Sequence, residues 1–528
     1  MALGPAGAVT AMMPDPPERL LARWPDDPRD TRPRAIVIGA GFGGLAAAVR
    51  LAVAGWRVQV LEKLDEPGGR ASVFRQDGYT FDAGPTLITV PQLFDELWSL
   101  AGARLEDDVQ LVPLDPFYRL RFHDGSHFDY CGDPARMRAE VARLCAADLA
   151  GYDRFLAESE RCWRIGFEEL GAKAFDSIGD LVRAVPSLIR MRSWRTMLAM
   201  ASRYFTDERL RTVFSFHPLL IGGNPASVTC TYSLITTLER RFGVHWAMGG
   251  TGALVRGLVS LLQRLQVPVR CGAEVKRVVI DGGRARGVEL ASGERLDADI
   301  VVSNGDVAWT YRNLVAPQHR RVWSDRKLDR ARYSMSLFVW YFGTDRRYED
   351  VPHHTIVLGP RYEPLLEDIF RRHVLADDFS LYLHRPTATE PGMAPPGHDA
   401  WYALVPVPHL DADVDWNARA ASFKLAIQRR LQDTMLPGLG AHLTTSRVMT
   451  PLDFRDRLLS DKGAAFGLEP LLLQSAWFRP HNRSEDVPGL YLVGAGTHPG
   501  AGVPGVLMSA KALMSVVPPV EQVARARR

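Results

Sequence analysis

Residues 34–55 read RAIVIGAGFGGLAAAVRLAVAG, and this stretch decides the fold of the chain. It opens with the short apolar run 35–38, which is typical of a central parallel strand covered on both faces. Gly39, Gly41 and Gly44 follow in the order G-x-G-x-x-G, and an alanine-rich segment with a helical pattern comes directly after them. The stretch therefore predicts a strand, a tight turn and a helix, the opening unit of a Rossmann-like α/β fold.

The three glycines have separate tasks in a dinucleotide-binding turn. The first allows the tight turn, the second lets a pyrophosphate approach the backbone, and the third lets the helix pack close to the strand. The helix N-terminus points free N–H groups at the phosphates, so Phe42 and Gly43 are expected at the same site. An ordinary strand-to-helix turn can show the same spacing in a chain with 45 glycines, so the neighbouring residues must decide.

The next predicted strand, residues 57–61, ends at an acid, as a dinucleotide site requires. Glu62 follows Gly44 by 18 residues, close to the ~20 expected for the carboxylate that binds a ribose hydroxyl, and Lys63 stands beside it. These neighbours favour the dinucleotide interpretation over a plain βαβ turn.

A second glycine turn indicates which dinucleotide is bound. Gly69 and Arg70 follow soon after the acid, and the run FDAGPT at 81–86 contains Gly84 and Pro85. Taken alone, Gly68-Gly69 could be a simple surface turn, and a nicotinamide fold does not need it. An FAD site can use it to approach the diphosphate and the flavin with backbone, while the arginine supplies a positive donor. We therefore predict FAD as the cofactor.

The composition is that of a globular protein with more than one domain. The chain has 528 residues, of which 46% are hydrophobic and 24% charged. Its net charge of +3 argues against general nucleic-acid binding. The five cysteines are odd in number and show no C-x-x-C spacing, which indicates free thiols in a reducing compartment, and we expect no metal site. No cysteine follows Cys271, which excludes a cysteine-linked flavin in the C-terminal part.

The pattern along the chain predicts discontinuous domains. Strand-rich sequence follows the FAD opening, a helical segment comes next, and α/β character returns at 275–303. We predict an α/β fold with a Rossmann-like FAD-binding domain, a substrate domain built on a mixed sheet, and a helical cap that faces a membrane. The predicted ranges are a flexible leader at 1–33, FAD binding at 34–115, 248–310 and 475–520, substrate binding at 116–147 and 311–474, and the cap at 148–247.

The C-terminal part contains a second strand-turn-helix of the phosphate-binding kind. An apolar run at 490–493 leads through a glycine turn into a helix predicted over 506–516, whose N-terminus would lie at the flavin. The remaining residues that we assign to the cofactor site come from this turn and from the middle segment: Val275, Gly494, Gly496, Gly505 and Val506.

Three segments of the sequence are apolar enough to be examined for membrane contact. The uncharged windows 212–238 and 487–510 contain too many glycines and prolines for a lipid-exposed helix, so we predict that they are buried and line a cofactor or an apolar cavity. Residues 181–205 carry five arginines, no acid and Trp194 between apolar residues. Such a segment is typical of a helix in a membrane interface, although a solvated face on a cap helix is the alternative.

Taken together, the motifs resemble the bacterial phytoene desaturase family of carotenoid biosynthesis, the lycopene-forming type, from about residue 34 to residue 517. The resemblance is carried by VIGAGFGGLA at 37–46, PGGRA at 67–71, FDAGPT at 81–86, FSFHPLLIGGNP at 214–225, QSAWFRPHNR at 474–483 and LYLVGAGTHPGAGVPGV at 490–506. The HPLLIGGNP and QSAWFRPHNR runs look particular to this family, whereas FAD fingerprints are shared by many oxidases.

The resemblance implies an FAD enzyme that takes phytoene through desaturated intermediates to lycopene, with neurosporene as the alternative end product. It also implies a cytoplasmic protein that is peripherally associated with the inner membrane, with a quinone or oxygen as electron acceptor. The chemistry would be hydride transfer from an allylic C–H to flavin N5, with loss of a proton from the neighbouring carbon. A long apolar tunnel should hold the hydrocarbon.

A carboxylate suspected of acid-base work in the family matches Asp148, in the run AADLAGY. The other interpretation is that this residue caps the helix that follows it. The residue before it is Ala147, where the family carries arginine.

Three alternatives remain open. A desaturase of a later or shorter carotenoid, of the hydroxycarotenoid or diapophytoene type, would share every motif quoted. A flavin amine oxidase would share the opening fingerprint only. A non-catalytic prenyl-lipid carrier can use the same architecture, but it would not need the glycines and Glu62 of an FAD site.

Overall fold

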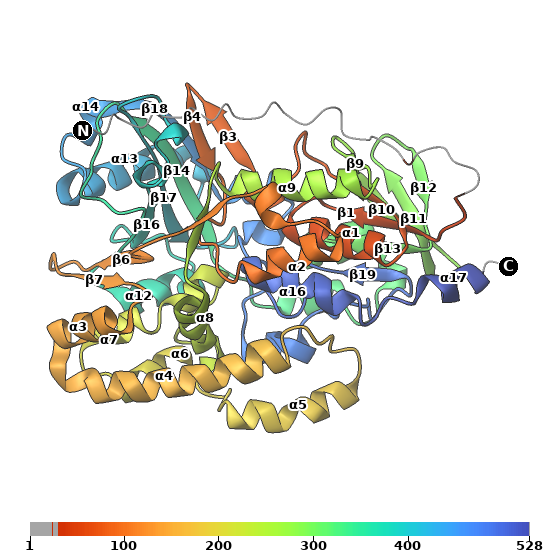
Figure 1. Ribbon diagram of the computed structural model, residues 1–528, viewed down its shortest axis with the longest axis horizontal. Coiled ribbons are helices and arrows are strands. Elements are labelled where there is room, and N and C mark those ends of the chain that lie inside the picture. Colours follow the sequence, from red (N-terminus) through yellow and green to blue (C-terminus); the bar gives the residue numbers. More distant parts are fainter. Residues whose placement is uncertain (1–23, 25–29, 527–528) are drawn as a thin grey trace, which may run out of the picture.

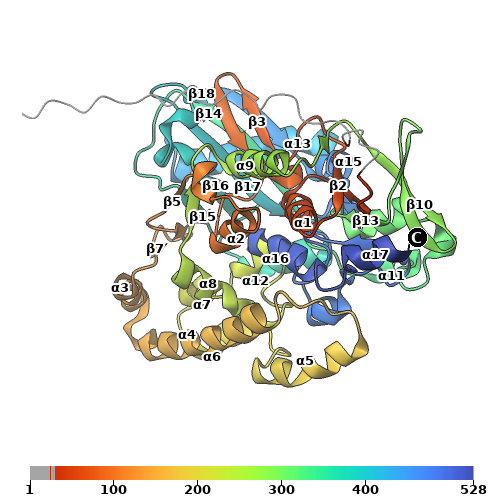
Figure 2. The ribbon, with the colours of Figure 1, turned by 45° about the vertical axis from the view of Figure 1, so that its right-hand side comes forward.

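The computed structural model describes Trp24 and residues 30–526. Figure 1 shows a parallel sheet with its helices at one end, a mixed sheet at the other, and a layer of helices that runs below both. The turned view in Figure 2 keeps the helices α3 to α6 on this same side of the molecule.

The first strand and helix form where the opening stretch predicts them, in a five-stranded parallel sheet with the order β19-β13-β1-β2-β9. Its strands are β1 (Arg34–Ile38), β2 (Arg57–Leu61), β9 (Val269–Arg270), β13 (Ile300–Ser303) and β19 (Leu490–Leu492). Helix α1 (Phe42–Val53) packs against α9 (Thr251–Arg264) and α16 (Val503–Leu513). Three segments far apart in the sequence thus build one sheet, because each supplies an apolar strand that is buried on both faces.

Several smaller elements complete this end of the molecule. Strands β10 (Val275–Asp281), β11 (Arg284–Leu290) and β12 (Arg295–Asp297) form a three-stranded antiparallel sheet, in which Gly282 and Gly283 make the turn between the first two strands. The others are the hairpin β3 (Val73–Gln76) with β4 (Tyr79–Asp82), α2 (Gln92–Leu100), and β5 (Leu111–Pro113) with β8 (His245–Ala247).

The mixed sheet has seven strands in the order β18-β14-β17-β16-β15-β6-β7. They are β6 (Tyr118–Arg121), β7 (His127–Tyr130), β14 (Ser336–Thr344), β15 (His354–Val357), β16 (Leu381–His384), β17 (Asp399–Val407) and β18 (Leu443–Met449). All neighbours are antiparallel except β15 and β6.

The two faces of this sheet bury different partners. On β14, Phe338, Trp340 and Phe342 pack with the long helix α13 (Trp416–Thr434), whereas Leu337 and Tyr341 face the core that continues toward the helical layer. This alternation follows from the period of two in a strand.

The helical layer consists of α3 (Pro134–Cys145), α4 (Leu149–Trp163), α5 (Ile178–Arg190), α6 (Met197–Tyr204), α7 (Glu208–Val213) and α8 (Leu234–Phe242). Helix α3 falls in the range predicted for substrate binding, 116–147, but it contacts α4 and α7 of the layer (Figure 1). None of the described helices combines the length and the apolarity that crossing a membrane requires.

The ends of the chain differ from the expectation in two places. The predicted leader lies outside the described residues except for Trp24 and 30–33, and the Trp24 indole donates a hydrogen bond to the Val58 carbonyl oxygen at 2.9 Å. Contacts with the parallel sheet therefore begin before Arg34. The last sheet-covering helix begins at Val503 rather than at Val506, because Pro504 fits the first turn of a helix.

Candidate active site

One cavity of about 600 Å³ begins at the carboxyl ends of β1 and β2 and extends between the mixed sheet and the helical layer. In a doubly wound sheet, ligands bind at this edge. Most of the residues predicted to bind the cofactor line the cavity: Gly39, Gly41, Phe42, Gly43, Glu62, Lys63, Gly69, Arg70, Gly84, Pro85, Val275, Gly505 and Val506. The structure thus brings together residues from five separate stretches of the sequence.

The other three predicted glycines pack behind the cavity wall. A Cβ at Gly44 would overlap the Gly39 carbonyl oxygen, so this glycine serves the close helix–strand approach. A Cβ at Gly496 would overlap Val307, and Gly494 donates its backbone N–H to Ser509 Oγ at 2.8 Å. These positions shape the turns but do not line the cavity.

Glu62 lies at the end of β2, as predicted, and its carboxylate holds the turn of the opening motif. Oε2 accepts a hydrogen bond from the Ala40 backbone N–H at 2.7 Å, and Oε1 accepts one from Leu64 at 2.9 Å. The side chain is buried, and burial raises the pKa of this carboxyl above its ordinary value. Glu62 therefore orders the glycine turn as well as lining the cavity.

Asn304 is a site residue that the sequence analysis missed. It follows β13 directly, and its side-chain amide lies against the opening turn, 3.0 Å from where a Cβ on Gly41 would stand and 2.5 Å from the same position on Gly43. Its position in the sequence could have identified it, because Asn304 directly follows an apolar run that is typical of a parallel strand, and ligands bind at the carboxyl ends of such strands.

Opposite the glycine turn, Arg70 lines the cavity and donates to Ser460 Oγ at 2.9 Å. Burial lowers the pKa of the guanidinium, and Asp306 counteracts this effect. A buried positive group beside backbone without side chains fits the diphosphate of FAD. The residues present therefore fit this cofactor.

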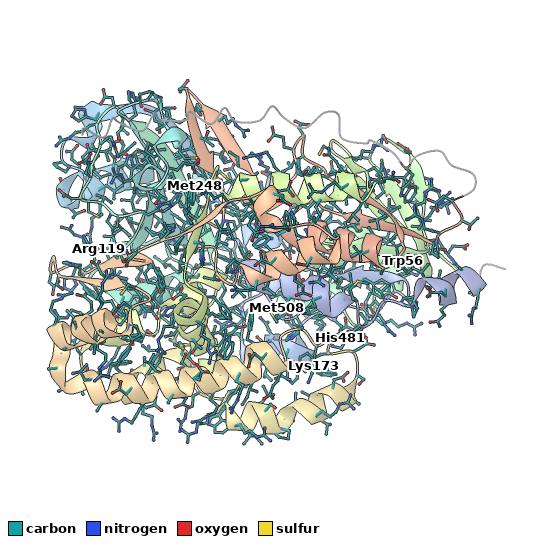
Figure 3. The ribbon with its side chains drawn as sticks, viewed as in Figure 1. Trp56, Arg119, Lys173, Met248, His481 and Met508 are labelled. Carbon is teal, nitrogen blue, oxygen red and sulfur yellow. The ribbon has the colours of Figure 1, made fainter. Side chains whose placement is uncertain are left out.

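Beyond the glycine turns the cavity wall becomes apolar. It is formed by α5, α8 and the inner face of the mixed sheet, with Leu181, Leu188, Ile235, Leu238, Leu337 and Ile356 among its side chains. Met508, labelled in Figure 3, lines the cavity from α16, and its methyl group lies 2.5 Å from where a Cβ on Gly171 would stand. The predicted uncharged windows 212–238 and 487–510 both contribute to this wall.

A hydrogen-bonded group lies next to the Gly84-Pro85 turn. Thr86 Oγ1 is 2.9 Å from the Tyr382 hydroxyl and 2.8 Å from the Tyr402 hydroxyl, and the Tyr382 hydroxyl is 2.6 Å from His354 Nδ1. Burial raises the pKa values of both tyrosines, so their hydroxyls stay protonated. Thr86, Tyr382 and Tyr402 give the cavity a small polar patch in a mostly apolar part of its wall.

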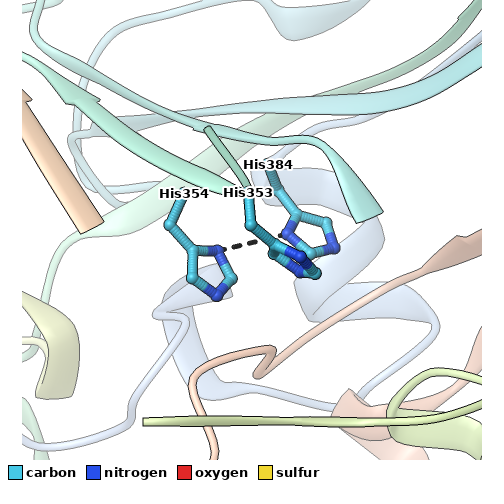
Figure 4. Close-up of side chains that lie close together, drawn as sticks. All are labelled: His353, His354 and His384. Carbon is cyan, nitrogen blue, oxygen red and sulfur yellow. Dashed lines mark hydrogen bonds between the residues drawn. The ribbon is translucent and has the colours of Figure 1, made fainter. Parts of the chain in front are cut away.

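Three buried histidines lie behind this patch (Figure 4). The rings of His353, His354 and His384 have centroids 4.4–5.1 Å apart, and the Nδ1 atoms of the last two are 3.3 Å apart. Burial lowers the pKa of His353 to about 3 and places those of the other two well below the ordinary value. All three rings are therefore neutral at pH 7.

Asp148 does not line the cavity. Its carboxylate accepts hydrogen bonds from the Thr206 N–H and hydroxyl at 2.8–2.9 Å and from the Asp207 N–H at 3.0 Å. These donors hold the pKa of Asp148 below its ordinary value although burial acts in the opposite direction. The side chain does not cap α4 either, because it makes no hydrogen bond to the first turn of that helix. Its observed contacts tie the start of α4 to the loop before α7.

The amino-acid sequence is similar to a known enzyme family over most of its length. Residues 42–512 match the family of flavin-containing amine oxidoreductases. A phytoene desaturase (neurosporene-forming) of Cereibacter sphaeroides is 49% identical over 95% of this chain and 97% of its own length. A phytoene desaturase (lycopene-forming) of Pseudescherichia vulneris is 48% identical over 92% of this chain and 99% of its own length.

Solved structures agree in fold. An oxidoreductase from Methanosarcina mazei superposes with a TM-score of 0.63 at 18% identity, covering 91% of this chain and 100% of its own. A variant of putrescine oxidase gives a TM-score of 0.61 at 15% identity, covering 94% and 99%. The chain belongs to the flavin-containing amine oxidoreductase family, in the branch of the bacterial phytoene desaturases.

Proposed function

We propose that the protein is an FAD-dependent carotenoid desaturase that converts phytoene to lycopene by successive dehydrogenations, with neurosporene as the alternative end product. The observation that carries this proposal is the single cavity, which joins a turn suited to the FAD diphosphate to a long apolar wall. The relatives named above, almost half identical over nearly the full chain, support the same activity.

When bound, FAD supplies the two-electron oxidant that takes a hydride from the substrate. The chain's own part is orientation and exclusion of water. A hydrocarbon offers no group for hydrogen bonding, so apolar side chains on α5, α8 and β14 must fix its position by shape alone. Because the reaction repeats along one chain, the substrate has to shift within this wall between steps.

Pigment analysis tests the proposal. A non-carotenogenic bacterial host that makes phytoene is supplied with this chain, and the carotenoids are extracted and separated. We expect lycopene, and the ratio of lycopene to neurosporene gives the number of steps. Unchanged phytoene in cells that contain folded, FAD-loaded protein would contradict the proposal and would favour a later or shorter carotenoid as substrate.

Two further assays separate the alternatives. Amines offered to the FAD-loaded protein should not be oxidised, since apolar side chains from α5, α8 and the mixed sheet dominate the cavity wall beyond the glycine turns. A cofactor-free lipid carrier would purify colourless, whereas we expect a yellow protein.

We also propose that α5 attaches the protein to a membrane. One face of this helix, with Leu181, Ala184 and Leu188, lines the cavity. The apolar stripe of the helix continues beyond these residues by about a quarter turn, and there it exposes large side chains, among them Ile178 at 63%, Val182 at 64%, Ile189 at 56% and, just beyond the helix, Trp194 at 62%. An apolar stripe wider than the surface it packs on is favourable only where its exposed part is also covered, and arginines on the polar side of the same segment suit anionic lipid.

This arrangement supports the expected location. A peripheral position on the cytoplasmic face of the inner membrane would let phytoene pass from lipid into the cavity beside α5. A quinone dissolved in the same lipid, or oxygen, would then serve as the electron acceptor.

A further inference from the structure

An acidic side chain lies in the wall of the cavity where the substrate offers it no polar partner. Glu239, on α8, lines the cavity next to Leu238 and is 1% exposed. The other acids of this wall, Glu62, Glu274 and Asp306, come from the segments that form the glycine-turn end. Burial of a carboxylate is costly unless the group is hydrogen-bonded, so its presence beside a hydrocarbon requires a reason.

Two buried side chains hold this carboxylate in place. The Tyr118 hydroxyl donates to Glu239 Oε2 at 2.7 Å, and His217 Nε2 lies 3.2 Å from the same oxygen. Tyr118 and His217 are also 3.1 Å apart, so the three groups form a closed triangle. Burial, together with the charge of Glu239, raises the pKa of Tyr118 well above its ordinary value, which keeps the phenol protonated as a donor.

The triangle leaves one oxygen of the carboxylate free for the cavity. Both neighbours bind Oε2, and among the described residues no hydrogen bond reaches Oε1. His217 comes from the run FSFHPLLIGGNP, whose Phe216 and Leu219 line the same cavity. The group is thus built from β6, the 217–221 turn and α8, and it presents one oxygen to the substrate side.

The reaction needs an acceptor at such a position. Formation of each double bond removes a hydride from one carbon and a proton from the next, and the hydrocarbon has no atom that can take the proton. Asp148 is separated from the cavity and saturated with hydrogen bonds. His498 also lines the cavity, but its Nε2 binds the Leu170 carbonyl oxygen, and burial together with the Arg479 charge opposes the positive charge that its ring would gain with a proton, which lowers its pKa to about 4.

We propose that Glu239 accepts the proton of the desaturation step, with Tyr118 and His217 positioning its carboxylate. One carbon loses a hydride to oxidised FAD, and the neighbouring C–H bond breaks as its proton moves to Glu239 Oε1. The electron pair of that second bond forms the new double bond, and the carboxylate becomes a carboxylic acid. This proposal rests on the desaturase function proposed above.

The test compares FAD-loaded Glu239→Gln with the wild-type protein in liposomes that contain phytoene. Under anaerobic conditions the loss of oxidised-flavin absorbance follows one dehydrogenation. We expect the glutamine variant to react about 10²–10⁴-fold more slowly, as for loss of a general base, while FAD content and phytoene binding stay unchanged. Glu239→Asp should retain part of the rate, since it keeps the carboxylate but moves it.

Glu158→Gln is the matched control, because it also neutralises a buried carboxylate of the helical layer, on α4, and Glu158 does not line the cavity. Its FAD-loaded form should reduce the flavin at a rate within a few-fold of wild type. A Glu239→Gln rate close to wild type, or a large loss confined to Glu158→Gln, would overturn the proposal.

Infrared difference spectra give a readout that does not depend on rate. On reduction by phytoene, the wild type should gain the C=O band of a protonated carboxyl group, and Glu239→Gln should lack it. If the glutamine variant does not hold FAD, Glu239→Asp decides: a shifted acid limb of its pH–rate profile supports the proposal, and an unshifted one overturns it. Failure of the wild type to use phytoene, by contrast, would refute the desaturase function itself.

Discussion

At the scale of single residues, Glu62 connects the opening glycine turn to the cofactor site. Both of its carboxylate oxygens accept backbone hydrogen bonds, from Ala40 and Leu64. Glu62→Gln replaces one acceptor by an NH₂ group that faces a backbone donor, so we expect weaker FAD binding by about tenfold or more, or about 1.4 kcal/mol. Titration of the apoprotein with FAD, followed by flavin fluorescence, measures this loss.

Glu66→Gln serves as the control, because Glu66 is exposed in the same loop and makes no contact with the turn among the described hydrogen bonds. Equal FAD affinities for the two variants would contradict the assigned role of Glu62.

Asp82 should make stability depend on pH. It is buried between β4 and the start of α9, and desolvation raises its pKa to about 7. Because this is above the value in the unfolded chain, about 3.9, the folded state binds the proton more tightly. The contribution of Asp82 to the free energy of unfolding is fully present below about pH 4 and is lost as the pH rises through 7. Each unit of difference between the folded and unfolded pKa corresponds to about 1.4 kcal/mol.

Thermal unfolding at pH 5.5 and pH 8 checks this prediction. The wild type should lose more stability between the two pH values than Asp82→Asn, whose side chain cannot ionise. An equal change in both proteins would show that Asp82 does not titrate in this range.

The three-histidine group should not retain a metal ion. One ligand atom from each ring can be chosen so that all three lie within 4.8 Å of one another, and the Nδ1 atoms of His354 and His384 are 3.3 Å apart, so the prediction rests on the hydrogen bonds that hold these rings rather than on their spacing. The Nδ1 atoms of His353 and His354 are also engaged with Thr389 and Tyr382, both at 2.6 Å. Elemental analysis of protein purified without a metal-affinity tag should find well below one ion per chain. A stoichiometric metal that disappears in His384→Ala would refute this expectation.

At the scale of elements, α5 carries four of the exposed large apolar side chains of the described residues, Ile178, Val182, Val185 and Ile189. These exposed side chains predict that Val182→Asp and Ile189→Asp, combined, reduce binding to anionic liposomes at least tenfold, because the acids oppose both insertion and the lipid charge. Flotation of protein with vesicles measures the bound fraction.

Leu425→Asp is the matched control, because Leu425 is an exposed apolar residue on α13, remote in sequence from α5. The control should float like wild type, and the α5 variant should keep its FAD. Normal flotation of the α5 variant would remove the basis for assigning membrane contact to this helix.

At the scale of the whole molecule, FAD should act as part of the structure. The cofactor end of the cavity is lined by residues drawn from the segments 38–43, 61–72, 273–275, 304–306 and 495–506, and these segments meet only in the folded state. Binding to the folded chain alone stabilises it by about 2.7 kcal/mol at 100 times the dissociation constant. The melting temperature should therefore rise with FAD concentration in wild type and rise less in Glu62→Gln. A melting temperature independent of FAD would contradict this coupling.

The local pattern of residues was sufficient to place several elements and to identify most of the predicted residues that line the glycine-turn end of the cavity. The opening strand and helix and the strand at 57–61 form where the apolar runs and the glycine turn place them. Such features depend on neighbours in sequence, so a short window contains the information. The boundaries of the predicted domains follow changes in this pattern and stay predictions. Helix α3, at one such boundary, contacts both β7 of the mixed sheet and α4 of the cap.

The polar groups of the cavity wall were decided by the tertiary structure alone. Asn304 reaches the glycine turn because β13 lies beside β1, and Glu239 meets Tyr118 and His217 because β6, a short turn and α8 converge. For Asp148 the resemblance implied an acid-base role at the site. In the folded chain its carboxylate instead binds Thr206 and Asp207, away from the cavity. The sequence by itself thus determined the fold class, the cofactor and the apolar character of the site. Contacts between distant segments decided which acid faces the cavity. A short window of sequence contains no information about such contacts.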